Sequence, residues 1–221
     1  MTTLFLIRHG LTGMTGSRLY GRTAGIHLDE RGRRQAAALV ERFEGIRLTA
    51  VYSSPLERCV ETVAPLAAAK RLEVRTANGL IEMDAGGWTG RTLRSLRRTK
   101  LWETVQRNPS MFRFPGGESF VEAEARVVGE VQRIVRRHPR GRVAIGTHGD
   151  LVRVLIAHFS GADLDRFQRV SADPASVSVV DFDGGVPRIL LVNDTGGLRR
   201  FAARREPPRT TRAPRARKLR G

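Results

Sequence analysis

Near its start the chain reads Leu4-Phe5-Leu6-Ile7-Arg8-His9-Gly10, a short apolar run followed directly by a cation, an imidazole and a glycine. The apolar run predicts a buried strand, and the C-terminal ends of strands are where open α/β sheets bind ligands. Arg8 can hold two phosphate oxygens, Gly10 lets the backbone approach closely, and His9 is a candidate nucleophile. A histidine at a strand end is more often only hydrogen-bonded, so the rest of the chain has to decide between the two interpretations.

Three further segments carry complementary chemistry. Residues 50–56 predict a second strand passing into a helix, with Pro55 in the first helical turn and Arg58 beside the helix N-terminus, where anions bind. Residues 79–90 set Glu82 and Asp84 in a glycine-rich loop, and residues 143–150 place His148 between a strand and a helix. Each alone has an ordinary structural explanation. Together they indicate two histidines, two arginines and an acid on one side of a sheet.

With these motifs the chain resembles the histidine phosphatase superfamily, also called phosphoglycerate mutase-like. The matching pieces occur in the family's order over about residues 3–195, namely Arg8-His9-Gly10, residues 28–36, residues 53–58, Leu80-Ile81-Glu82 with residues 86–90, Pro115-Gly116-Gly117-Glu118-Ser119, and Thr147-His148-Gly149-Asp150. The resemblance implies that the catalytic residues are His9, Glu82, Arg8, Arg58 and His148. It implies phosphate binding by Arg8, Gly10, Thr15, Gly21, Arg58, His148 and Gly149. Many relatives carry an asparagine where this chain has Thr15, whose hydroxyl is a candidate substitute.

The expected chemistry is phosphoryl transfer to the imidazole of His9. Arg8, Arg58 and His148 would hold the phosphoryl oxygens without a metal ion, and no cofactor is implied. Glu82 would protonate the leaving oxygen and later activate water, although Asp84, two residues away, is a competing acid. The resemblance favours Glu82 because the family's acid follows the apolar pair that Leu80-Ile81 matches. The acid phosphatase branch has an aspartate directly after its second histidine, and Gly149 occupies that position here.

Hydrolysis is favoured over mutase chemistry. In phosphoglycerate mutases the acid is followed by Arg, a variable residue and Tyr, whereas Glu82 is followed by Met83-Asp84-Ala85. Losing a cation and gaining an anion disfavours phosphoglycerate. We therefore expect a phosphomonoesterase that acts through phosphohistidine on a small phosphorylated metabolite. The alternatives are mutase-type phosphoryl transfer, a phosphate-binding pseudoenzyme, and a nucleic-acid-associated protein acting through its C-terminal tail.

Composition separates a domain over residues 1–198 from a basic tail over residues 199–221. The net charge of the chain is +17, and the tail contributes nine arginines and one lysine against the single acid Glu206. The tail has no periodic apolar face and predicts disorder. It lacks the interleaved aromatics that stack bases, so we expect no specific nucleic-acid partner.

The remaining sequence features bear on compartment and assembly. No apolar stretch approaches the roughly 20 residues that span a bilayer, and the N-terminus does not resemble a signal peptide. Cys59 is the only cysteine, which predicts a small core residue, excludes an intrachain disulfide and favours a reducing cytoplasm. The histidines show no zinc-ligand spacing. The sequence leaves a homodimer open.

Periodicity predicts a three-layer α/β/α domain, with a mostly parallel sheet of about six strands and helices on both faces. Strands are expected at residues 3–8, 50–53, 73–76, 142–147, 176–182 and 188–192. Helices are expected at residues 29–43, 55–70, 119–138 and 150–159, with shorter pieces near 93–106 and 164–169. Residues 181–187 predict a hairpin turn, and residues 88–118 are long enough to form a lid over the sheet edge.

Overall fold

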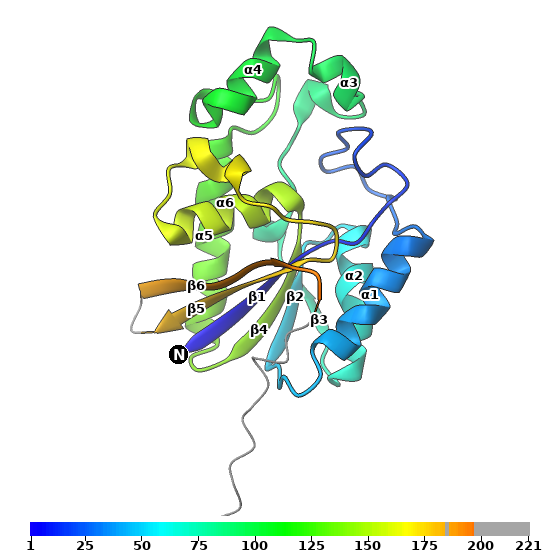
Figure 1. Ribbon diagram of the computed structural model, residues 1–221, viewed down its shortest axis with the longest axis vertical. Helices are drawn as coiled ribbons and strands as arrows, with labels where there is room; N and C mark the ends of the chain where they lie inside the picture. The colour runs from blue at the N-terminus through cyan, green and yellow to red at the C-terminus, as the bar shows by residue number, and fades with distance from the viewer. Residues whose placement is uncertain (184–185, 197–221) are drawn as a thin grey trace, which may run out of the picture.

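The computed structural model describes residues 1–183 and 186–196, within which a six-stranded sheet lies between two helical layers (Figure 1). The strand order is β3-β2-β4-β1-β5-β6. The strands are β1 (Thr2–Arg8), β2 (Ala50–Ser53), β3 (Val74–Thr76), β4 (Arg142–Thr147), β5 (Val177–Asp183) and β6 (Val186–Asp194). The pairs β1–β4, β2–β4 and β2–β3 are parallel, whereas β1–β5 and β5–β6 are antiparallel. The predicted fold class is confirmed, with an antiparallel edge formed by β5 and β6.

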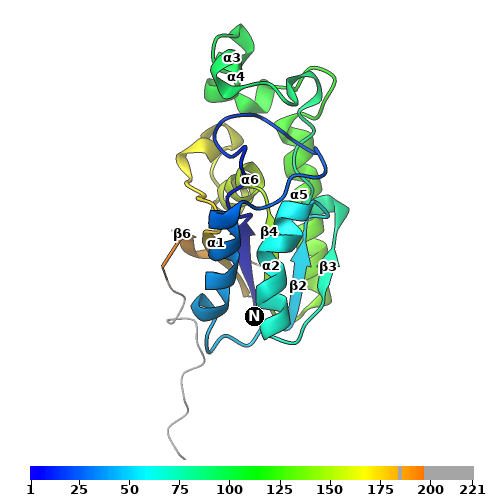
Figure 2. The ribbon, with the colours of Figure 1, turned by 90° about the vertical axis from the view of Figure 1, so that its right-hand side faces the viewer.

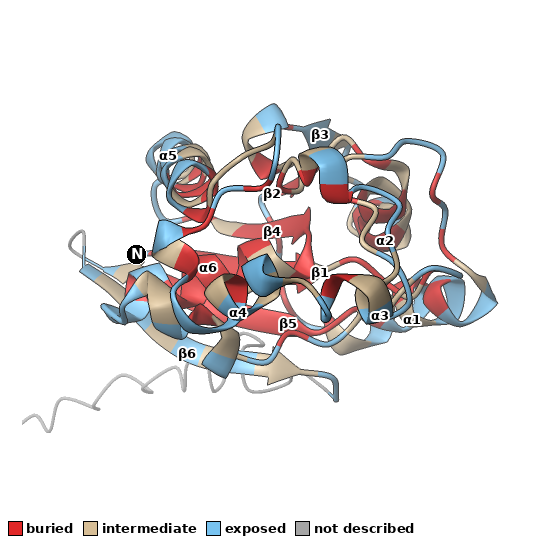
Figure 3. Cartoon of the chain, turned by 90° about the horizontal axis from the view of Figure 1, so that it is seen from above, coloured by how far each residue is buried: buried red, intermediate tan, exposed pale blue. Residues whose placement is uncertain are grey.

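The central strand β1 is buried on both faces, which explains why it reads as a continuous apolar run. Phe5 and Ile7 belong to the core under α1 (Glu30–Arg42) and α2 (Glu57–Ala69). Leu4 and Leu6 belong to the core under α5 (Phe120–Arg137) and α6 (Gly149–Ser160). Figures 2 and 3 show these two helix pairs on opposite sides of the sheet.

Capping residues set two of the helix starts. Asp29 accepts from the backbone N–H of Gly32 at the start of α1, and Ser119 forms a reciprocal capping box with Glu122 at the start of α5. Helix α2 begins at Glu57, so the prediction that Pro55 lies in its first turn was wrong. The chain stays extended because the N–H of Ser54 still bonds to the carbonyl of Gly146 in β4.

The segment predicted as a lid rises above the carboxyl ends of the parallel strands (Figure 1). It contains η2 (Gly86–Trp88), α3 (Leu93–Leu96), α4 (Lys100–Arg107) and η3 (Pro109–Met111), and it is anchored by an aromatic cluster made of Trp88, Trp102, Phe112, Phe114 and Phe120. The short helices η1 (Asn78–Leu80) and η4 (Leu164–Arg169) complete the described part of the chain. Within that part, no helix has the length and apolarity needed to cross a membrane. The turn predicted over residues 181–187 was too long, since residues 181–183 belong to β5 and residues 186–187 to β6. Residues 184–185 and the basic tail predicted at 199–221 lie outside the described residues.

Candidate active site

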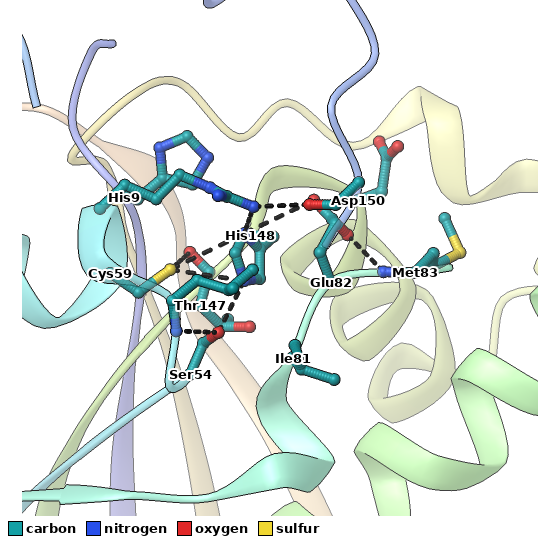
Figure 4. Close-up of polar contacts among 12 residues, drawn as sticks. His9, Ser54, Cys59, Ile81, Glu82, Met83, Thr147, His148 and Asp150 are labelled. Carbon is teal, nitrogen blue, oxygen red and sulfur yellow. Dashed lines mark hydrogen bonds and ion pairs between the residues drawn. The ribbon is translucent and has the colours of Figure 1, made fainter. Parts of the chain in front are cut away.

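Residues from four separate segments converge at the carboxyl edge of the sheet (Figure 4). Arg8 ends β1 and His9 follows it, Arg58 lies in the first turn of α2, and His148 joins β4 to α6. The rings of His9 and His148 lie 5.5 Å apart, and His148 Nδ1 is 3.6 Å from Glu82 Oε2. The structure therefore brings together the five residues that the sequence singled out for catalysis.

His9 is held as a neutral imidazole. Its Nδ1 lies 2.8 Å from the carbonyl oxygen of Gly10, which can only accept, so Nδ1 carries the proton and Nε2 keeps a free lone pair. Burial, together with the charges of Arg58 and Arg8, lowers the pKa of His9 to about 3. Nε2 of His9 is therefore unprotonated at neutral pH, as a nucleophile requires.

The two arginines keep donors without protein acceptors. Arg8 Nη1 donates to the carbonyl of Ala172 at 2.6 Å, and Arg58 Nη2 donates to the carbonyl of Gly21 at 2.7 Å. Within residues 1–183 and 186–196, Nε of Arg8 and Nε of Arg58 are buried and have no hydrogen-bond partner. A buried guanidinium N–H left unpaired is unfavourable, and anionic oxygens are the acceptors that a guanidinium binds most strongly.

His148 is wholly buried and contacts the side chains of Ser54, which precedes α2, and Cys59, which lies in α2. Its Nε2 is 2.8 Å from Ser54 Oγ and 3.5 Å from Cys59 Sγ, while Nδ1 faces Arg58 and Glu82. Burial and the neighbouring His9 and Arg58 hold the pKa of His148 well below its usual value. Ser54 Oγ can donate to Nε2 or accept from it, whereas Arg58 Nη2 can only donate to Nδ1.

The loop that carries Glu82 is fixed through its backbone. Arg22 donates to the carbonyl of Glu82 at 2.8 Å, and Arg126 donates to the carbonyl of Ile81 at 2.8 Å. Glu118 pairs with both arginines, at 3.2 and 2.8 Å. Burial, followed by the negative charge of Asp150, raises the pKa of Glu82 to about 7. A carboxyl with that pKa is half protonated at neutral pH and can act as an acid or a base.

Asp84 occupies a different environment from Glu82. One of its carboxylate oxygens accepts from the N–H of Gly86 at 2.9 Å. Its side chain is absent from the walls of the cavity beside His9, whereas Glu82, Met83 and Ala85 are part of them. Glu82 is thus the acid of this loop that faces His148.

The residues expected to bind phosphate divide into two groups. Thr15, Gly21 and Gly149 line the cavity, although the Thr15 hydroxyl also bonds to Thr12 and the Gly21 carbonyl bonds to Arg58. Gly149 packs closely against Arg8, because a Cβ there would lie 3.0 Å from Arg8 Nε and would require the guanidinium to shift. Gly10, Arg58 and His148 are not among the residues that form the cavity walls, and the backbone that approaches Gly10 closely is that of Gly32 in α1.

A cavity of about 360 Å³ opens from the reaction centre toward the lid. Arg8, His9 and Glu82 form one end of it. Most of the remaining wall is apolar and comes from the lid and its neighbours, with Leu19, Trp88, Leu93, Trp102, Val105, Phe114, Phe120 and Phe167. In the described chain, no cluster of three or more His, Cys, Asp or Glu side chains is arranged to hold a metal ion.

Sequence reasoning missed the residues that support the site. Ser54 and Glu118 lie inside motifs that were singled out, yet their partners His148 and Arg126 could be found only in three dimensions. Cys59 is buried in the core as expected, but its contact with His148 was not foreseen. Tyr20, whose ring lies 4.7 Å from the Arg58 guanidinium, carried no signal in the sequence.

Comparison with known proteins agrees with this geometry. Residues 4–195 match the profile of the histidine phosphatase superfamily (branch 1). The chain belongs to this superfamily. Phosphoserine phosphatase 1 of Hydrogenobacter thermophilus is 32% identical over 204 residues, which cover 91% of this chain and 96% of the relative.

Solved structures of the histidine phosphatase superfamily show the same fold. Bacillus stearothermophilus YhfR superposes with a TM-score of 0.82 and 30% identity, covering 88% of this chain and 98% of that one. The mycobacterial glucosyl-3-phosphoglycerate phosphatase Rv2419c gives a TM-score of 0.78 and 26% identity, covering 86% and 98%. The family assignment made from motifs is confirmed.

Proposed function

We propose that the chain is a phosphomonoesterase that hydrolyses a small phosphorylated metabolite through a phosphohistidine on His9. The observation that carries the proposal is the free Nε2 of a neutral His9 beside two buried, unpaired guanidinium Nε atoms. Phosphatases among the similar proteins, named for phosphoserine and for glucosyl-3-phosphoglycerate, support hydrolysis of this kind of substrate.

In the first step His9 Nε2 attacks phosphorus, the N–P bond forms and the P–O bond to the alcohol breaks. Glu82 gives its proton to the departing alkoxide, and Arg8, Arg58 and His148 hold the equatorial oxygens. In the second step water attacks the phosphohistidine while the Glu82 carboxylate takes a proton from it. Inorganic phosphate leaves, and both His9 and Glu82 return to their starting states.

Phosphoglycerate mutase-type transfer is the weaker candidate. Met83 and Ala85, which follow Glu82, line the cavity and supply no cation there. The cytoplasmic location, the absence of a specific nucleic-acid partner and the dispensable basic tail belong to the same proposal. They rest on the lone cysteine and on the composition of residues 199–221.

The direct test is to trap the intermediate with a radiolabelled phosphomonoester. The label should survive in alkali and disappear in acid, as phosphohistidine does, and it should be absent from His9→Ala. Arg34→Gln, a change at an exposed arginine on α1, is the matched control and should label like the wild type. Label retained on His9→Ala would exclude His9 as the nucleophile. A panel of phosphomonoesters that includes phosphoglycerates would then rank the substrates.

A further inference from the structure

Arg153 is a cavity residue that the chemistry above does not use. It lies on α6 one helical turn after Asp150, and its Nη1 donates to Asp150 Oδ1 at 3.0 Å. Among the described residues, Nε of Arg153 is buried and has no hydrogen-bond partner, while 31% of the side chain is exposed. Arg153 therefore keeps a buried donor that no described protein group satisfies, and the residue lines the substrate cavity.

Among the described residues that line the cavity, Arg8 is the only other one with a buried side-chain polar atom that lacks a hydrogen-bond partner. Arg18 Nη1 donates to the carbonyl of Gly90 at 2.8 Å, and Gln168 Nε2 donates to the carbonyl of Val105 at 2.9 Å. The rest of the cavity wall is largely apolar. A charged group with an unmet donor in such a wall is unfavourable until a ligand supplies an acceptor, and an anionic acceptor satisfies it best.

The backbone of Arg153 lies about one helical turn from the phosphate end of the cavity. Gly149, at the start of α6, packs directly against Arg8 at the phosphate end of the cavity. Arg153 follows four residues later, which is about 6 Å along the helix axis. A three-carbon acid phosphorylated at one end carries its carboxylate at a comparable separation.

We propose that Arg153 binds a carboxylate on the alcohol part of the substrate, with Asp150 orienting its guanidinium. The preferred substrates are then phosphate esters of small hydroxy acids, including hydroxy amino acids. This inference rests on the proposed function for the placement of the phosphate at His9. The sequence suggested that the charge of Asp84 would repel such a carboxylate. In the structure the Asp84 side chain bonds to the N–H of Gly86 and lies outside the cavity walls.

Two matched pairs of ligands isolate the carboxylate. 3-Phosphoglycerate and glycerol 3-phosphate differ only by a carboxylate in place of a hydroxymethyl group. Phosphoserine and phosphoethanolamine differ only by a carboxylate in place of hydrogen, and they carry an ammonium group that Asp150 can contact. Binding of all four is measured by calorimetry on His9→Ala protein, and phosphate release is measured separately on protein with His9 intact.

We expect the carboxylate member of each pair to bind at least about tenfold more tightly than its partner, as a charge-assisted hydrogen bond implies. Arg153→Gln and the bulkier Arg153→Met, each combined with His9→Ala, should bring this ratio close to one. Arg34→Gln in the same background should leave it unchanged. The ratio in protein with Arg153 intact tests the inference even where a variant folds poorly.

Three results would overturn the inference. They are equal binding within both pairs when Arg153 is intact, an unchanged ratio in both Arg153 variants, and loss of the ratio only in Arg18→Gln. Tighter binding of the carboxylate members without any phosphate release would support the Arg153 site while refuting the proposed hydrolysis. The two proposals therefore fail separately.

Discussion

Replacing Glu82 with glutamine removes the proton that a leaving alkoxide needs and keeps the size of the side chain. The structure raises the pKa of this carboxyl from 4.5 to about 7. At pH 7 that shift increases the protonated fraction from about 0.3% to about one half, roughly 150-fold. General acid catalysis contributes about 10² to 10⁴ in rate, so Glu82→Gln should lower kcat/KM on an alkyl phosphate by about that factor.

The pH dependence gives the same residue a second signature. His9 is neutral above about pH 3, whereas the acid form of Glu82 is lost as the pH rises through about 7. For the wild type, kcat/KM on an alkyl phosphate should therefore fall above pH 7, and this alkaline limb should be missing in Glu82→Gln.

The assay compares an alkyl phosphate with p-nitrophenyl phosphate, whose leaving group needs little protonation. Glu82→Gln should affect the aryl ester far less than the alkyl ester, and Asp84→Asn is the matched control. Equal losses on the two esters, or an alkaline limb that persists in Glu82→Gln, would refute the assignment. Leaving-group dependence confined to Asp84→Asn would transfer the role to Asp84.

Three other changes test separate parts of the site. EDTA should leave activity unchanged, because Arg8 and Arg58 supply the positive charge at the phosphate. Activity lost in EDTA and restored by Mg²⁺ would contradict this. A chain truncated after Leu198 should keep its kcat on a small phosphomonoester, and a large fall in kcat for the folded truncation would show that the tail acts in catalysis. Ser54→Ala should lower kcat more than about tenfold while changing KM little, because His148 loses the partner of its Nε2. Imidazole ¹⁵N shifts should show a changed His148 tautomer in this variant. Unchanged shifts would show that Ser54 does not set it.

The sequence predicted the layers of the fold because its strongest signals are local. Apolar runs flanked by turns located the strands, and capping residues such as Ser119 located helix starts. The start of α2 was misplaced because a hydrogen bond from Ser54 to Gly146, 92 positions away in the sequence, outweighs the preference of Pro55 for a first helical turn.

The reacting groups were predictable because they sit in compact motifs at strand ends. Their environment was not, since it depends on partners from distant segments. The raised pKa of Glu82 needs burial and the charge of Asp150, and the position of its loop needs Arg22, Glu118 and Arg126. The periodicity of apolar residues is a local pattern and does not predict contacts between distant segments. The role expected of Gly10 also changed, because it accommodates Gly32.

The lid and the reacting groups occupy different stretches of the chain. Arg8, His9, Arg58, Glu82 and His148 all lie outside residues 88–118, whereas Trp88, Leu93, Trp102, Val105, Gln106 and Phe114 of that stretch form much of the cavity wall. Insertions, deletions or grafts between Leu93 and Met111 can therefore alter which alcohols are accommodated while the phosphoryl-transfer apparatus is retained. Changes within this segment could therefore alter the substrate range, both during evolution and in laboratory redesign, without altering the scaffold.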